Sequence, residues 1–268
     1  MPCVKEVLVE DWASYQDEVD QILENFEARR STTSKGLVSA PLFRGQSNQS
    51  WPPLTTLERF SAKSWSIKRY HRLLQSVGPA VFSLTSKAWN LGEDPDNVDQ
   101  SRHIPPPAYE FMIYLRHYGF PSPLLDWSRS PYVAAFFAFE HQPDCEAVAV
   151  YVFQEYLGYP KLFSGDGASI IGLGSYVITH ERHYAQLCEY TICKKPVDKD
   201  YVYCNHEEAL RDRVVPQDSL RQYIIPVTER QSFLRKRESM NIHAYSLFRD
   251  ETSLMQTLAY REIEQDDL

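Results

Sequence analysis

The sequence predicts an α+β fold, because helical patterns dominate the first half of the chain and strand patterns the second. A helix over residues 10–30 is indicated by apolar side chains that recur every three or four residues: Trp12, Tyr15, Val19, Ile22, Leu23 and Phe26. Strands are indicated by the apolar run EAVAVYVFQEY at residues 146–156 and by QYIIPV at residues 222–227. Together these elements suggest a modest sheet with flanking helices.

The first half of the chain then divides as follows. LVSAPLFRGQ at residues 37–46 predicts a short strand with Arg44 near its end, and two prolines soon afterwards prevent its continuation. Residues 62–89 are mostly helical in pattern. Residues 90–107 contain four prolines and few apolar side chains, which predicts an exposed connection.

The central stretch predicts two helices separated by a loop. AYEFMIYLRHYG is helical up to Gly119, which serves as a C-terminal cap, and FPSPLLDWSRS at residues 120–130 is expected to be a loop. Ser130 and Pro131 are a favourable start for the helix PYVAAFFAFEH, since the serine accepts from free amides and the proline loses no hydrogen bond.

Beyond residue 157 the patterns are shorter. The glycine-rich segment around residues 165–174 lacks phosphate-loop spacing and is expected to be a flexible loop. YAQLCEYTIC predicts a strand whose one face carries alternate residues, namely Gln186, Cys188, Tyr190 and Ile192. A helix begun by Thr228, then a closing strand and helix, and an acidic tail over residues 261–268 complete the prediction.

Composition limits the classes of function. The chain of 268 residues has a net charge of −8, with 43% hydrophobic and 24% charged residues, which is typical of a soluble globular protein. This charge argues against binding nucleic acid through overall charge. A local basic run is usually a solvated helix face, but it offers a phosphate track for RNA: Arg230, Arg235, Lys236 and Arg237.

Cysteine usage and hydropathy favour a cytoplasmic protein without a membrane span. The five cysteines are scattered, as expected for reduced thiols, and no apolar run approaches the ~20 residues that span a bilayer. No metal site is expected, because the four potential ligands nearest one another match no finger or ribbon spacing: Cys188, Cys193, Cys204 and His206.

Four sequence blocks, in their order, resemble the FRG domain, named for its Phe-Arg-Gly motif. FRGQ at residues 43–46 is followed by HYGFPSPLLDWSRSPYVAAFFA at residues 117–138, and these are the most specific blocks. ERHYAQLCEYT at residues 181–191 and FLRKRESMNIHAYSLFRDETSLMQTL at residues 233–258 resemble the later blocks. The resemblance implies an N-terminal helical segment at residues 1–37, an FRG domain at 38–260 and the tail.

FRG domains are distantly similar to ADP-ribosyltransferases of the Arg-Ser-Glu kind, so the resemblance implies a split sheet around an NAD cleft. It implies that Arg44 contacts the cofactor, that Ser128 and Ser130 brace the site, and that Gly45 lets the cofactor approach the backbone. Cleaving the nicotinamide bond requires a cation for the diphosphate and an anion beside the developing oxocarbenium. Aromatic rings would hold nicotinamide; the candidates are Tyr118, Trp127 and Tyr132.

The catalytic acid is not placed by the motif. Gln186 occupies the first position of a Gln-x-Glu pattern, but Cys188 stands at the second. Glu189 is favoured if a bulge turns it inward. Otherwise Glu181 or Asp126 acts as the acid, or the cleft binds a nucleotide without transfer.

Each candidate also has a structural alternative. In the structural alternative, Arg44 would pair with a buried carboxylate such as Asp126. The two serines would cap the next helix, and Gln186 would satisfy a buried backbone group. His117 ends a helix, where the dipole alone favours a histidine.

Three hypotheses of function remain open at this point. The first is an NAD-dependent ADP-ribosyltransferase, a toxin-like effector in a toxin-antitoxin or phage-defence system, which modifies RNA or protein and has an antitoxin covering its cleft. The second is a nucleotide-binding or partner-recruiting module. The third is a hydrolase using Asp126, His117 and a serine, although the sequence has no nucleophile-elbow motif.

Overall fold

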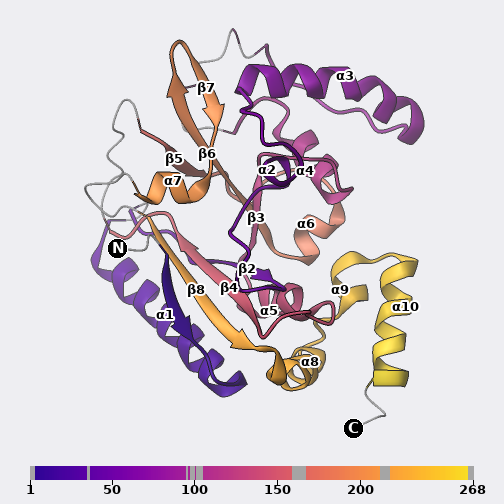
Figure 1. Cartoon of the computed structure of the whole chain (residues 1–268). Helices are drawn as coiled ribbons and strands as arrows, with labels where there is room; N and C mark the ends of the chain where they lie inside the picture. The colour runs from indigo at the N-terminus through magenta and orange to yellow at the C-terminus, as the bar shows by residue number, and fades with distance from the viewer. Residues whose placement is uncertain are drawn as a thin grey trace.

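The computed structural model describes residues 4–34, 37–94, 96, 100, 105–158, 167–211 and 218–264. The predicted α+β class is confirmed: one mixed sheet has the strand order β1-β8-β4-β2-β3-β6-β5, and β7 pairs with β6 (Figure 1). Only β1 and β8 run parallel among these pairs. The strands are β1 (Lys5–Leu8), β2 (Leu42–Gln46), β3 (Leu125–Ser128), β4 (Ala147–Gln154), β5 (Ser169–Gly172), β6 (Cys188–Val197), β7 (Asp200–Tyr203) and β8 (Ser219–Pro226).

The helices follow the apolar periodicities of the sequence. They are α1 (Trp12–Thr32), α2 (Thr56–Phe60), α3 (Ile67–Thr85), α4 (Tyr109–His117), α5 (Pro131–Phe139), α6 (Glu181–Ala185), α7 (His206–Arg211), α8 (Arg230–Ser239), α9 (Ala244–Phe248) and α10 (Glu251–Ala259). A 3₁₀ turn (Val227–Glu229) precedes α8, and a π-helical turn (Tyr260–Glu264) extends α10. None of the described helices is long and apolar enough to span a membrane.

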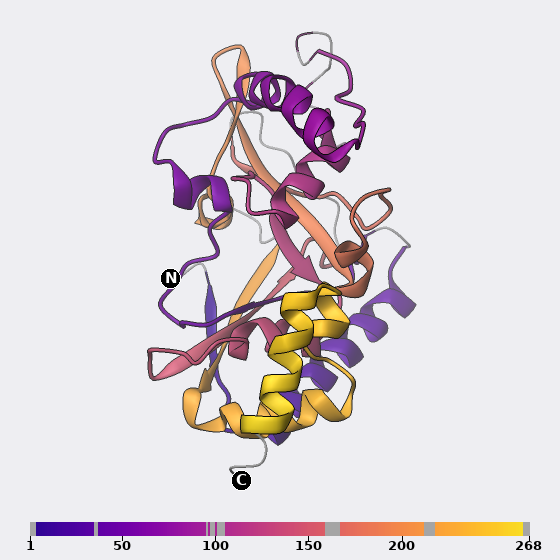
Figure 2. The same cartoon turned by 90° about the vertical axis from the view of Figure 1, so that its right-hand side faces the viewer.

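The sheet nearly divides between β2 and β3. β2 pairs with β4 along its whole length, but it faces β3 only at Phe43 and Ser128. Figure 1 shows β3, β5, β6 and β7 with α3 and α4 in one half, and β1, β2, β4 and β8 with α1, α5 and α8 in the other. In Figure 2 the half with β3, β5, β6 and β7 lies above the half with β1, β2, β4 and β8, and we call them the upper and lower halves. Helices α9 and α10 lie beside the lower half.

Each half has its own core. In the lower half, α1, α5 and α8 pack on the sheet, and the ring centroids of Trp12 and Phe233 lie 4.8 Å apart. In the upper half, α3 and α4 pack on β6, burying Tyr70, Met112 and Tyr190. β1 and α1, from the predicted N-terminal segment at residues 1–37, complete the sheet and core of the lower half.

Several local predictions are confirmed. Ser130 caps α5, its hydroxyl accepting from the Val133 amide at 3.3 Å, with Pro131 as the first helical residue. Gly119 adopts φ +84° just beyond α4, in the left-handed conformation that favours glycine. Arg44 lies within β2, as the strand prediction required.

Other local predictions are wrong. The expected loop at residues 120–130 contains β3, a strand of four residues that is too short for its periodicity to be recognised. The closing strand expected after residue 240 is replaced by α9 and α10, because His243 and Asp250 each form a capping box. Residues 261–264 of the predicted tail lie in the π-helical turn, where Arg261 pairs with Glu238 at 2.5 Å.

Candidate functional site

A cavity of about 350 Å³ lies where β2 and β3 separate, and we call it the junction cavity. Strands β2 and β3, the turn after β2, and helices α2, α4 and α5 contribute to it. Its lining combines three arginines with two carboxylates, hydroxyl, amide and aromatic groups, and includes Arg44, Gln46, Trp51, Arg59, Arg116, Asp126, Ser128, Phe137, Glu140, Gln186 and Cys188.

Two arginines converge on one carboxylate in this cavity. Arg44 from β2 and Arg116 from α4 both donate to Oδ1 of Asp126 in β3, and Arg44 also donates to the Asp126 carbonyl oxygen at 3.0 Å. The arginine side chains are 12% and 8% exposed, whereas that of Asp126 is 38% exposed. The carboxylate is therefore reachable from the cavity, and the expected alternative partner of Arg44 is present.

The protonation state of Asp126 is set by the two guanidiniums that lie beside it. Burial opposes ionisation of Asp126, but the Arg116 and Arg44 guanidiniums hold the pKa of its carboxyl well below the usual range. Nε of Arg44 and Nε of Arg116 are buried and have no hydrogen-bond partner among the described residues. With Arg59 also in the lining, guanidiniums outnumber carboxylates, so the cavity suits an anion.

Glu189, the acid favoured by the sequence analysis, does not line the junction cavity. The ladder between β3 and β6 is regular, with Trp127 opposite Glu189 and Ser128 opposite Cys188, and no bulge turns Glu189 inward. Its carboxylate lies 3.8 Å from Nε of Arg129. Burial raises the pKa of Glu189, although the Arg129 charge lowers it. The alternation of an ideal strand accounts for this orientation.

Gln186 and the two serines have structural partners. The Gln186 side-chain amide donates to the Leu247 carbonyl at 3.2 Å, which satisfies a buried backbone group. The Ser128 hydroxyl donates to the Gln186 carbonyl at 2.8 Å and accepts from the Ser130 amide at 3.0 Å. Ser128 and Gln186 still border the cavity, whereas Ser130 is the cap of α5.

The aromatic residues expected to hold nicotinamide are positioned otherwise. The indole Nε1 of Trp127 donates to Thr191 at 2.8 Å, and its buried ring stacks on Phe153. Tyr118 is 56% exposed outside the cavity, where its hydroxyl hydrogen-bonds His180. Tyr132 stacks on Trp12 in the lower core, so it is also unavailable. Of the three, only Trp127 lines the cavity, together with Phe43, Trp51 and Phe137.

Gly45 serves helix packing rather than ligand approach. A Cβ at this position would lie 1.9 Å from the Ala134 carbonyl oxygen and 2.5 Å from the Ala138 amide nitrogen, both in the backbone of α5. Glycine is therefore required because the helix crosses β2 at very short range. Gly45 also borders the cavity, so its role in the approach of a ligand stays a prediction.

Sequence reasoning missed Arg116, Arg59 and Glu140 as lining residues. Arg116 follows the apolar run FMIYL in α4, and a charged side chain on a buried helix face is a signal that could have identified it. His117 lies beside it but outside the lining, hydrogen-bonded to the Tyr190 hydroxyl at 3.0 Å. Burial lowers the pKa of His117 to about 3, so the ring is neutral at physiological pH. Glu181 is exposed at the start of α6 and also lies outside the lining.

The basic run near the C-terminus is not a solvated face throughout. Of the four cations, Arg230 and Arg237 are buried, whereas Arg235 and Lys236 are exposed. A phosphate track built from all four cations is therefore not present on the surface.

Most residues that line the junction cavity lie in a segment of the chain that matches a known protein family. No match was found among curated proteins or among solved structures. The model of the FRG domain family matches residues 39–146, a range that supplies Arg44, Arg59, Arg116, Asp126, Ser128 and Glu140, whereas Gln186 and Cys188 come from outside it. The Phe-Arg-Gly strand β2, helix α4 and the β3–α5 unit thus lie in the segment, residues 39–146, that matches the FRG domain family.

Proposed function

We propose that the chain is an NAD-dependent ADP-ribosyltransferase that modifies a macromolecule, with NAD bound in the junction cavity. The observation that carries the proposal is the convergence of Arg44 and Arg116 on Asp126, beside the third guanidinium of Arg59. Planar guanidiniums bind diphosphate oxygens in pairs, and the buried Nε atoms still have hydrogen-bonding capacity. The residues present therefore fit a dinucleotide.

In this proposal the arginines hold the diphosphate and Asp126 replaces Glu189 as the anion of the site. Bound NAD supplies an activated glycosidic bond, whose cleavage leaves positive charge on the ribose. Asp126 is ionised and partly exposed, so its carboxylate can stabilise that charge. Trp51, half exposed, and Phe137 offer apolar surfaces for a ring.

A second candidate is a nucleotide-binding module without transferase activity. It is favoured by the position of Glu189 outside the lining and by Cys188 at the place where the Gln-x-Glu pattern has its acid. In this case Asp126 acts only as the partner of the two arginines. The candidates differ in turnover, not in nucleotide binding.

The test combines NAD binding with the fate of labelled NAD in a cell lysate. The wild-type protein is expected to release nicotinamide and to transfer label into material destroyed by protease or by RNase, which identifies the acceptor. Binding without release or transfer would support the module instead. Absence of NAD binding by folded protein would contradict both candidates.

A variant of an exposed lining residue tests the binding site without destabilising the fold. Arg59 is exposed and lines the cavity, so Arg59→Gln is expected to weaken NAD binding about 10-fold while leaving the thermal unfolding temperature unchanged. Arg30→Gln, an exposed arginine on α1, is the matched control. Glu189→Gln distinguishes the two acids, because transfer is expected to persist if Asp126 is the anion of the site.

A further inference from the structure

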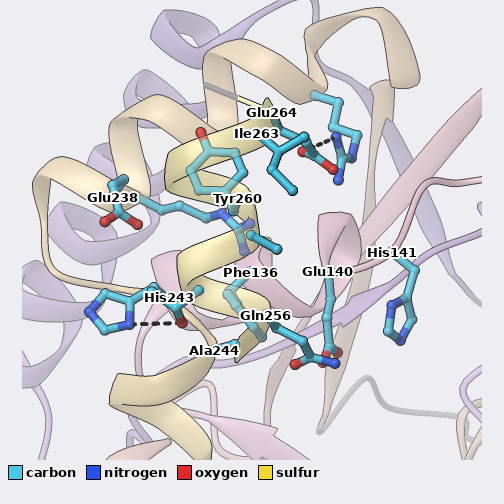
Figure 3. Close-up of a pocket in the computed structure, with 14 residues that line it drawn as sticks. Phe136, Glu140, His141, Glu238, His243, Ala244, Gln256, Tyr260, Ile263 and Glu264 are labelled. Carbon is cyan, nitrogen blue, oxygen red and sulfur yellow. Dashed lines mark hydrogen bonds and ion pairs between the residues drawn. The ribbon is translucent and has the colours of Figure 1, made fainter. Parts of the chain in front are cut away.

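A second cavity, also of about 350 Å³, lies at the C-terminal side of the lower half, and we call it the C-terminal cavity. Figure 3 shows Phe136 of α5 and Glu140, which follows that helix, beside Glu238 of α8, Gln256 of α10 and Tyr260 of the π-helical turn. Its volume falls within the range of pockets that hold small molecules. The proposed transferase site does not use this cavity.

Arg237 is a buried cation that lines the C-terminal cavity and has unused hydrogen-bonding capacity. The residue is 8% exposed, and its Nη1 atom has no hydrogen-bond partner among the described residues. Its guanidinium lies 4.6 Å from the centre of the Phe136 ring, which holds it in place. Burial lowers the pKa of Arg237 to about 10, so it remains charged at physiological pH.

The other charges around Arg237 are mostly compensated. Arg230 pairs with Glu264 at 3.2 Å, and Glu238 pairs with Arg261 at 2.5 Å. Two histidines, His141 and His243, also line the cavity, and burial lowers the pKa of His243.

Two further groups in the lining are available to a ligand. The Tyr260 hydroxyl is buried and has no partner in the part of the chain that the structure describes. Glu140 forms none of the ion pairs found among those residues, and burial raises the pKa of its carboxyl. A buried donor without a partner costs stability, so Arg237 and Tyr260 favour a ligand that accepts from both.

We infer that the C-terminal cavity binds a small molecule that presents an oxyanion to Arg237 and the Tyr260 hydroxyl, and a hydrogen-bond donor to Glu140. The oxyanion is a phosphate or a carboxylate, since both accept from a guanidinium fork. A polyanion is disfavoured, because the carboxylate of Glu140, which has no ion-pair partner among the described residues, would repel further negative charge. A singly anionic head with an amine or hydroxyl elsewhere fits this distribution.

Calorimetric titrations with inorganic phosphate, acetate and O-phosphoethanolamine test the inference. Saturable binding of phosphate or acetate is expected, and the preferred oxyanion identifies the head group. Arg237→Gln is expected to weaken that binding at least ~10-fold. Arg235→Gln changes an exposed arginine of the same helix and should have no effect. Absence of saturable binding by all three probes, or binding equally strong in Arg237→Gln, would overturn the inference.

Two more variants make the test independent of the stability of Arg237→Gln. Tyr260→Phe removes a hydroxyl that has no protein partner among the described residues, so it should weaken oxyanion binding about 5-fold without lowering the thermal unfolding temperature. O-phosphoethanolamine, whose amine can donate to Glu140, should bind more tightly than phosphate, and Glu140→Gln should abolish that difference. Equal binding of the two by wild-type protein would refute the role of Glu140. Arg59→Gln should weaken NAD binding in the junction cavity but leave phosphate binding in the C-terminal cavity unchanged. This difference distinguishes the two sites.

Discussion

Asp126→Asn is the most informative perturbation of the junction cavity, because it removes one charge while preserving the shape of the side chain. Arg44 and Arg116 would keep their buried positions, at 12% and 8% exposure, without the carboxylate that both contact. Removing one partner of a fully buried ion pair costs about 3–5 kcal/mol. Because the Asp126 side chain is 38% exposed, solvent screening reduces this, and we expect a loss of about 2–3 kcal/mol at pH 7.

The stability difference should also depend on pH in a defined direction. The two guanidiniums lower the pKa of Asp126 in the folded state, so its ionisation stabilises the fold above the unfolded-state pKa, near 3.9. This contribution disappears as the pH falls through the lower, folded-state pKa. The wild-type protein should therefore lose its advantage over Asp126→Asn progressively below about pH 4.

Urea denaturation followed by circular dichroism at pH 7 and at pH 3 measures this effect. At pH 7 the variant midpoint should fall by about 1 M, given an m-value near 2–3 kcal/mol/M. Asp20→Asn, an exposed carboxylate on α1, should change stability by less than about 0.5 kcal/mol. An Asp126→Asn midpoint equal to that of wild type at pH 7, or a difference that does not shrink at pH 3, would refute this account of the cluster.

Two further substitutions test how α5 is held. Gly45→Ala places a methyl group 1.9 Å from the Ala134 carbonyl, so we expect a loss of about 3 kcal/mol and a thermal unfolding temperature lower by about 6–12 °C; Gly78→Ala, where the added Cβ meets only a side chain at 3.4 Å, is the control, and an equal effect of both would contradict the packing argument. Tyr15→Phe removes the 2.8 Å hydrogen bond to the Pro131 carbonyl and should cost about 1 kcal/mol in urea denaturation, whereas an unchanged midpoint would show that this bond does not anchor α1 to α5.

The parts of the fold that the sequence predicted are those determined by local chemistry. The start of α5 was predictable because Ser130 and Pro131 satisfy helix-start requirements without help from distant residues. Strand β3 was missed because a four-residue strand between prolines has too few residues to show alternation. The C-terminal segment was misassigned because two capping boxes outweighed a short apolar run.

The candidate site was predicted only in part, because its chemistry depends on pairings between distant segments. Arg44 and Asp126 were named as a possible pair, and the structure brings them together. Arg116 was not foreseen: its place after an apolar run marks it as unusual, but its contact with β3 depends on how α4 packs. The alternation of β6 correctly placed Glu189 away from the face of Cys188, so favouring it as the acid required a bulge that the ladder lacks.

The charged cluster compensates for the weakest connection in the sheet. β2 and β3 share one facing pair of residues, so the backbone ladder alone provides little to hold the two halves together. Arg44 bonds from β2 to both the carbonyl and the carboxylate of Asp126 in β3, and Arg116 adds a contact from α4. The separation of the strands creates the junction cavity, and the side chains that bridge the separation are the ones that give the cavity its charge. A ligand anion would therefore meet guanidiniums whose positions are already fixed by the fold, which lowers the entropic cost of binding it.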